Sequence, residues 1–203
     1  MIVYVETNFL LELAYLQERC ESCRALLTLA NGGAITLALP AVCATEARAT
    51  WYRRAADRRA LHTTVHNQIR EISRSEPFRD LLDQSRNVLA ALVDRGEESR
   101  QRLEEAIDAV ATSATMVPLT SEIVATARWH EIAYSLTPQD AVVLASVRAH
   151  AESHAGPKVF VSQDAKGFAH PTVYDELSAV ECKVLVNFTD ALAYVRNALK
   201  APD

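Results

Sequence analysis

Four acidic side chains stand where an α/β fold could bring carboxylates together. Two follow predicted strands almost directly and two lie early in predicted helices; they are Glu6, Glu46, Asp140 and Asp164. Carboxylates so close together would repel strongly unless a cation bound between them. Oxygen ligands without histidine or cysteine suit Mg²⁺ or Mn²⁺ rather than zinc. Two such ions can activate a water and stabilise the entering and leaving oxygens of a phosphodiester.

Each acid also has an ordinary explanation. Glu6 could be a polar residue at a strand end, and Asp164 could initiate a turn. Asp140 stands near a helix N-terminus, where the helix dipole favours any aspartate. Glu46 could face solvent or pair with an arginine such as Arg53. An acidic site is absent only if all four of these explanations apply. The joint occurrence of the four acids therefore favours a shared acidic site.

The first part of the chain alternates between strand and helix. An apolar, β-branched strand at Ile2–Val5 is followed by a helix that Thr7 or Asn8 could cap. A second helix is predicted over about 18–30, where Asn-Gly-Gly ends it, and a second strand over 34–39. A further helix follows the next proline and carries Glu46.

Residues 53–115 differ in character from the rest of the chain. Charge pairs and apolar residues at helical spacing predict two or three amphipathic helices, with breaks at Pro77 and Gly96. This segment would form a helical arm inserted into the α/β core.

The C-terminal part returns to alternating helices and strands. Helices are predicted from 120 and from 138, the second with Thr137 as its cap, and the motif AKGF is predicted as a loop. Strands are predicted at 158–162 and 182–186, and a terminal helix from Thr189. The pattern predicts an α/β fold with a mostly parallel central sheet flanked by helices. In such a sheet, the strand ends and first helical turns converge on one edge, so the four acids would share a crevice.

Composition is that of a globular protein rather than a disordered or fibrous one. With 203 residues, of which 49% are hydrophobic, the chain can bury one sizeable core. No apolar run approaches the roughly 18 residues needed to cross a bilayer, and the start lacks the features of a signal peptide. We therefore expect no membrane partner and a cytoplasmic location. The net charge of −5 means that a nucleic acid would need a local basic patch.

A basic cluster lies just beyond Glu46. Its members are Arg48, Arg53, Arg54, Arg58 and Arg59. They could be a solvated helix face that makes i, i+4 pairs, or a track that leads nucleic-acid phosphates to the acidic crevice. Trp51 and Tyr52 could stack on bases or pack against the arm.

Cysteine and histidine offer weaker signals. Cys20 and Cys23 form a C-x-x-C pair, but their surroundings are typical of a helix and no second pair completes a zinc set. A structural role is favoured. His62 and His66 lack the glutamate of a metalloprotease helix.

The order and spacing of the acidic motifs resemble the PIN domain, the nuclease fold of VapC-type toxins. The motifs are V-E-T-N at the first strand, Glu46, T-P-Q-D-A-V-V-L-A and V-F-V-S-Q-D-A-K-G-F, and they cover about 1–52 and 117–190. The resemblance places the family's four metal-binding catalytic acids on Glu6, Glu46, Asp140 and Asp164. It places ligand-orienting residues on Thr7, Asn8 and Ser162. The basic cluster, rather than the resemblance, makes Arg48, Arg53 and Arg54 candidates for RNA binding.

Two positions depart from the pattern of the family. Glu6 stands where the family usually has aspartate, so its carboxylate reaches one methylene further. Gly167 stands where the family often has a further aspartate. Both departures bear on catalysis.

The resemblance implies one PIN-like domain over 1–203, with the arm inserted at about 53–115. It implies a Mg²⁺- or Mn²⁺-dependent endoribonuclease that cleaves single-stranded or structured RNA to a 5′-phosphate and a 3′-hydroxyl. It also implies a homodimer and a toxin role with an antitoxin partner. One alternative is a catalytically weak or inactive RNA-binding or scaffold module. Another is a phospho-acceptor receiver domain, although the paired acids that a receiver needs early in its chain are missing.

Overall fold

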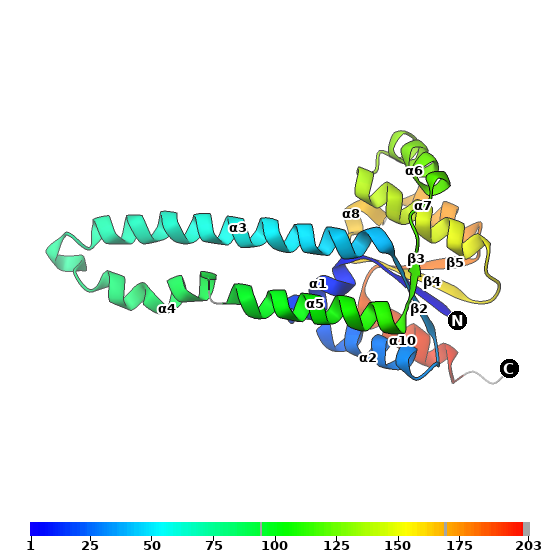
Figure 1. Ribbon diagram of the computed structural model, residues 1–203, viewed down its shortest axis with the longest axis horizontal. Coiled ribbons are helices and arrows are strands. Elements are labelled where there is room, and N and C mark those ends of the chain that lie inside the picture. Colours follow the sequence, from blue (N-terminus) through cyan, green and yellow to red (C-terminus); the bar gives the residue numbers. More distant parts are fainter. Residues whose placement is uncertain (94, 169, 201–203) are drawn as a thin grey trace.

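Five parallel strands form the centre of the protein (Figure 1). The computed structural model describes residues 1–93, 95–168 and 170–200. The strands are β1 (Ile2–Val5), β2 (Thr36–Pro40), β3 (Thr115–Val117), β4 (Lys158–Val161) and β5 (Cys182–Leu185). Their order across the sheet is β3-β2-β1-β4-β5, and every neighbouring pair is parallel. This confirms the predicted α/β class. The order differs from the 2-1-3-4-5 order of receiver domains, so the receiver alternative is wrong.

Helices cover both faces of the sheet, which gives three layers (Figure 1). One layer consists of α1 (Thr7–Tyr15), α2 (Cys20–Asn31), α5 (Arg95–Ser113) and α10 (Phe188–Ala198). The opposite layer consists of α7 (Pro138–Glu152) and α9 (Pro171–Ser178), with α6 (Ser121–Tyr134) packed on α7. Because β1 lies in the middle of the sheet, all four of its residues are buried.

The arm is a long helical hairpin that extends away from the sheet (Figure 1). Its first side is α3 (Ala41–Ile72), whose 32 residues span about 48 Å without interruption. The 3-10 helix η1 (Glu76–Phe78) contains the predicted break at Pro77, and α4 (Leu81–Val93) leads back to α5. α3 continues without a break through Arg53, near which the arm was expected to begin, and Gly96 is the second residue of α5. The assignment of the arm as an insertion within one domain stays a prediction.

Several short elements differ from the sequence prediction. β3 was not predicted, because three residues are too few to show an alternating pattern. The AKGF segment forms the helical turn α8 (Ala165–Phe168) instead of a loop, and α9 was also not predicted. The last helix starts at Phe188, one residue before the expected Thr189, because Asn187 caps it.

The core joins the strands to helices on both faces. The four cysteines, Cys20, Cys23, Cys43 and Cys182, are buried and free, as a structural role requires. No helix among residues 1–93, 95–168 and 170–200 is long and apolar enough to cross a membrane.

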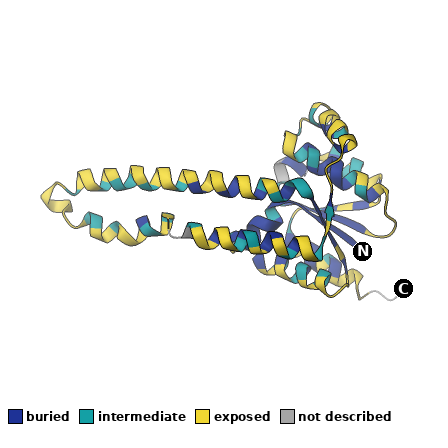
Figure 2. Cartoon of the chain, viewed as in Figure 1, coloured by how far each residue is buried: buried dark blue, intermediate teal, exposed yellow. Residues whose placement is uncertain are grey.

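The base of the arm belongs to this core, whereas its far end is exposed (Figure 2). The Trp51 side chain on α3 is buried, and its Nε1 donates to Ser99 Oγ on α5 at 3.0 Å. Leu103 on α5 is 1% exposed. Arg102 Nε donates to the carbonyl oxygen of Ala14 at the end of α1 at 2.9 Å. These contacts hold α1, α3 and α5 together.

We expect Leu103→Ala to lower the free energy of unfolding by about 2–5 kcal/mol, because it leaves a cavity where α5 packs on the core. Leu61→Ala on α3 is the control, because Leu61 is 51% exposed and its loss should cost less than about 0.5 kcal/mol. Urea unfolding followed by circular dichroism measures both. Equal losses in the two variants would contradict the packing of α5 described above.

Candidate active site

Glu6 lies buried at the junction of β1, β4 and α1. Its side chain is 4% exposed, and both carboxylate oxygens accept hydrogen bonds. The Asn8 backbone N–H donates to Oε2 at 2.8 Å, and Ser162 Oγ donates to Oε1 at 3.2 Å. Glu6 is therefore the N-cap of α1, and the predicted caps Thr7 and Asn8 are wrong. The residue suits this role because its backbone is still extended where the strand ends, with φ −128° and ψ −170°.

Burial raises the pKa of Glu6 to about 7, although the hydrogen bonds from Asn8 and Ser162 act in the opposite direction. An isolated carboxylate removed from water favours its neutral form. Glu6 is thus held at the edge of ionisation near neutral pH.

Glu46 reaches the same region from the second turn of α3. The Thr7 hydroxyl donates to Glu46 Oε2 at 2.5 Å, so the residue after Glu6 orients the second acid. Burial raises the pKa of Glu46, the Thr7 bond lowers it, and the charge of Asp140 raises it again. Arg53 also lowers this pKa, but it forms no ion pair with Glu46 among the described residues.

Asp140 is placed by the start of α7, where the predicted cap and proline are both confirmed. The Asp140 backbone N–H donates to Thr137 Oγ1 at 3.2 Å, and this hydroxyl donates to Asp140 Oδ2 at 2.7 Å. Burial raises the pKa of Asp140, and the nearby charge of Asp164 raises it further.

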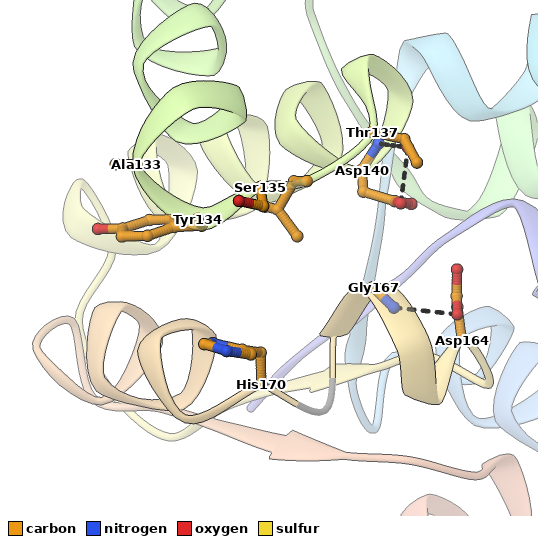
Figure 3. Close-up of a pocket in the computed structure, with 9 residues that line it drawn as sticks. Ala133, Tyr134, Ser135, Thr137, Asp140, Asp164, Gly167 and His170 are labelled. Carbon is orange, nitrogen blue, oxygen red and sulfur yellow. Dashed lines mark hydrogen bonds between the residues drawn. The ribbon is translucent and has the colours of Figure 1, made fainter.

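Asp164 lies in the turn that follows β4. Its backbone N–H donates to Ser162 Oγ at 2.9 Å, so the hydroxyl that binds Glu6 also shapes this turn. The Gly167 backbone N–H donates to Asp164 Oδ1 at 3.1 Å. Figure 3 shows Asp140 and Asp164 facing each other beside Gly167.

Gly167 leaves room for this approach of two carboxylates. A Cβ atom at this position would lie 3.0 Å from Asp140 Oδ2 and 3.2 Å from Asp164 Oδ2. The two oxygens are therefore no farther apart than the sum of these distances. Gly167, which departs from the pattern of the PIN family, therefore stands where a side chain would crowd the carboxylates of both Asp140 and Asp164.

All four acids line one cavity of about 180 Å³ at the carboxyl edge of the sheet. Thr7, Asn8, Arg53 and Arg54 line it as well, whereas Ser162 is buried against Glu6. Arg48 is not brought to the cavity, because it forms an ion pair with Glu104 on α5. Trp51 packs inside the base of the arm, and Tyr52 is exposed.

Sequence reasoning missed two kinds of residue around the acids. Thr50 lines the acidic cavity and lies one helical turn after Glu46, a spacing that could have indicated it. Tyr134 and His170 line a larger cavity of about 510 Å³ that also contains Asp140 and Asp164 (Figure 3). His170 belongs to the segment before α9, which showed no sequence signal.

The side chains that could act as metal ligands in the acidic cavity suit a divalent cation. They offer carboxylate and hydroxyl oxygens, and burial penalises the ionised form of Glu6, Glu46 and Asp140. Within the described part of the chain, no three His, Cys, Asp or Glu side chains converge closely enough to hold an ion together. The residues therefore offer suitable ligands without a preassembled coordination shell.

The raised pKa of Glu6 predicts an unusual dependence of stability on pH for the metal-free protein. Between the ordinary value of 4.5 and about 7, folded Glu6 holds a proton that the unfolded chain has released. Stability should thus be highest below pH 4.5 as far as this group is concerned, fall as pH rises to about 7, and then level off. At about 1.4 kcal/mol per pH unit, the loss is on the order of 3 kcal/mol.

Urea unfolding in EDTA at pH 5, 6, 7 and 8 measures this effect. Glu6→Gln should remove it, whereas Glu122→Gln, an exposed position on α6, should retain it. An identical pH profile for the wild type and Glu6→Gln would show that Glu6 does not titrate in this range.

Comparison with known proteins agrees with this geometry. A PIN domain family model matches residues 3–168, from β1 to the end of α8, and it runs through the arm that the sequence motifs did not cover. Searches of curated proteins and of solved structures gave no significant match. PIN domains are generally nucleases that bind RNA and use divalent metals. The acids at the sheet edge and the match over most of the chain lead to one conclusion: this protein belongs to the PIN domain family.

Proposed function

We propose that the protein is a metal-dependent endoribonuclease that cleaves single-stranded RNA at the acidic cavity. The observation that carries this proposal is the convergence of Glu6, Glu46, Asp140 and Asp164 from four separate segments on one small cavity. Such a group of half-buried and buried acids is costly to ionise without a cation, and perturbed carboxyl groups of this kind are typical of functional sites.

Mg²⁺ or Mn²⁺ bound here would supply a Lewis acid for the phosphodiester and lower the pKa of an attacking water. The four acids would hold the ions. Thr7 orients Glu46 and Thr137 orients Asp140, so these two carboxylates are held in fixed directions in which they would bind an ion. Ser162 and the Asn8 backbone hold Glu6 in the same way. Hydrolysis at this site would leave a 5′-phosphate and a 3′-hydroxyl.

Two arginines offset the negative charge that would repel RNA from the acids. Arg53 and Arg54 line the acidic cavity, and neither pairs with a carboxylate among the described residues. They are suited to bind phosphates next to the scissile bond. Arg48 leaves the proposed RNA track because Glu104 neutralises it.

The toxin role, an antitoxin partner and a homodimer rest on the family resemblance alone. A neighbouring reading frame for a small DNA-binding protein would support the toxin role. Size-exclusion chromatography with light scattering would test the homodimer.

A second candidate function is a PIN-like module that binds RNA without cleaving it. The observation in its favour is that both oxygens of Glu6 are already engaged, one in capping α1 and one with Ser162. A ligand position committed to structure leaves fewer free oxygens for a metal. The two functions differ in one measurable property, which is cleavage.

We expect the wild type to cleave a single-stranded RNA in Mn²⁺ or Mg²⁺ and to lose this activity in EDTA. Asp140→Asn should reduce the rate by about 100-fold or more, because it removes the charge and keeps the shape. Asp175→Asn, at an exposed position on α9, should cleave normally. RNA that binds to the wild type but is not cleaved in either metal would favour the non-catalytic module.

We expect Gly167→Ala to weaken Mn²⁺ binding by about 10-fold, because its methyl group would displace the carboxylates of Asp140 and Asp164. Gly96→Ala is a matched control, since nothing lies within 4 Å of a Cβ atom there. Isothermal titration calorimetry with Mn²⁺ measures both affinities. Equal affinities in the two variants would show that the close approach at Gly167 has no part in metal binding.

A further inference from the structure

A second polar cavity lies at the base of the arm, outside the acidic site. Its volume is about 450 Å³, and it is enclosed by the end of α1 and by α3, α4 and α5. Its lining residues are Tyr15, Leu16, Arg58, Ala91, Glu98, Ser99 and Arg102.

Two hydrogen-bonding groups in this cavity are buried and unsatisfied. Neither Tyr15 Oη nor Arg58 Nη2 has a hydrogen-bond partner within the described part of the chain. An arginine nitrogen can only donate, and a tyrosine hydroxyl can donate as well. Leaving such groups unpaired is costly, so both favour a ligand rich in acceptor oxygens.

The charge of Arg58 is also uncompensated, unlike that of four arginines farther along the chain in the arm. Each of these pairs with a carboxylate three residues earlier; they are Arg74, Arg79, Arg86 and Arg100. Within the cavity, Glu98 lies 3.5 Å from Arg102 and so offsets that charge. Arg58 instead lies over the Tyr15 ring at 5.7 Å, without a carboxylate partner among the described residues. The cavity therefore keeps one net positive charge and favours an anion.

One row of side chains on α3 links this cavity to the acidic site. Glu46, Thr50, Arg54 and Arg58 follow one another at four-residue spacing, so each lies beside the next, in a row that winds by about 120° around the helix from Glu46 to Arg58. Arg54 lines the acidic cavity, and its guanidinium group lies over the Tyr15 ring, 5.3 Å from the ring centroid. Tyr15 in turn lines the second cavity, so Arg54 and Tyr15 connect the two cavities. Arg58 follows Glu46 by twelve positions, which corresponds to about 18 Å along the helix, a length that a few nucleotides of single-stranded RNA can cover.

We propose that the cavity of Tyr15 and Arg58 is a second phosphate-binding subsite, which holds a backbone phosphate of the RNA several nucleotides from the acids. The proposal rests on the proposed function, because the RNA strand must continue from the acidic cavity. The subsite would make the protein prefer longer RNA strands over very short ones. Arg54 and the Tyr15 ring would contact the strand between the two cavities.

The test compares the binding of two fluorescein-labelled oligouridylates, of about 4 and about 12 nucleotides. The shorter strand can occupy the acidic cavity alone, whereas the longer strand can reach both cavities. EDTA is present throughout, so cleavage does not enter the measurement. Arg58→Gln removes the charge and Tyr15→Phe removes only the hydroxyl. Arg70→Gln is the matched control, because Arg70 is an exposed arginine near the far end of the same helix.

We expect the longer strand to lose about fivefold or more in affinity in Arg58→Gln and in Tyr15→Phe, with no change for the shorter strand. Arg58→Gln should also reduce the salt dependence of binding by about one phosphate contact, whereas Tyr15→Phe should leave it unchanged. Arg70→Gln should behave as the wild type. Equal affinities of all variants for the longer strand would overturn the proposal.

A second arm of the experiment separates RNA from free phosphate and from water. Inorganic phosphate should raise the melting temperature of the wild type and Arg70→Gln, but not that of Arg58→Gln. No effect on the wild type would mean that water alone fills the cavity, which overturns the proposal. A phosphate effect that depends on Arg58, together with RNA binding that does not, would assign the cavity to free phosphate and overturn the RNA subsite. If the wild type binds neither length of RNA, the nuclease proposal fails as well, and the phosphate result then stands alone.

Discussion

The buried carboxylate of Glu6 ties together the segments that build the acidic site. It caps α1, and it accepts a hydrogen bond from Ser162 at the end of the neighbouring strand. The Ser162 hydroxyl in turn accepts from the backbone of Asp164, and Thr7, the first residue of α1, holds Glu46. Because Glu46 and Asp164 are oriented by Thr7 and Ser162, which adjoin or bond to Glu6, a shift at Glu6 would pass to both. The parallel sheet makes this possible, since β1 and β4 end side by side.

The same arrangement concentrates negative charge where water is scarce. Burial raises the pKa of Glu6, Glu46 and Asp140, so the folded protein opposes the ionisation that metal binding requires. Functional sites commonly sacrifice stability in this way. A divalent cation would reverse the balance, because it favours the ionised carboxylates. The arginines of α3 then provide local positive charge in a protein whose net charge is −5.

Local sequence signals predicted the parts of the fold that depend on neighbouring residues. The strand at Ile2–Val5 and the cap at Thr137 follow from apolar patterning and capping chemistry. The sequence could not show that Arg48 pairs with Glu104, which is 56 residues away, or that Gly167 touches two carboxylates. Those contacts exist only once distant segments have packed. The sequence also could not show that one helix runs through Arg53, because the helix continues while its surroundings change from core to solvent.

The helix α3 shows why the arm cannot be independent of the acidic site. Its first turns carry Glu46 into the cavity, and the same rigid helix continues to Arg58 at the base of the arm. Between them, Trp51 bonds to Ser99 on α5. A change in the way α5 packs would therefore rotate or shift α3 and move the Glu46 carboxylate relative to Glu6. The arm thus fixes the position of an acid, and along the RNA path that we propose it would also set the direction in which the strand leaves that acid.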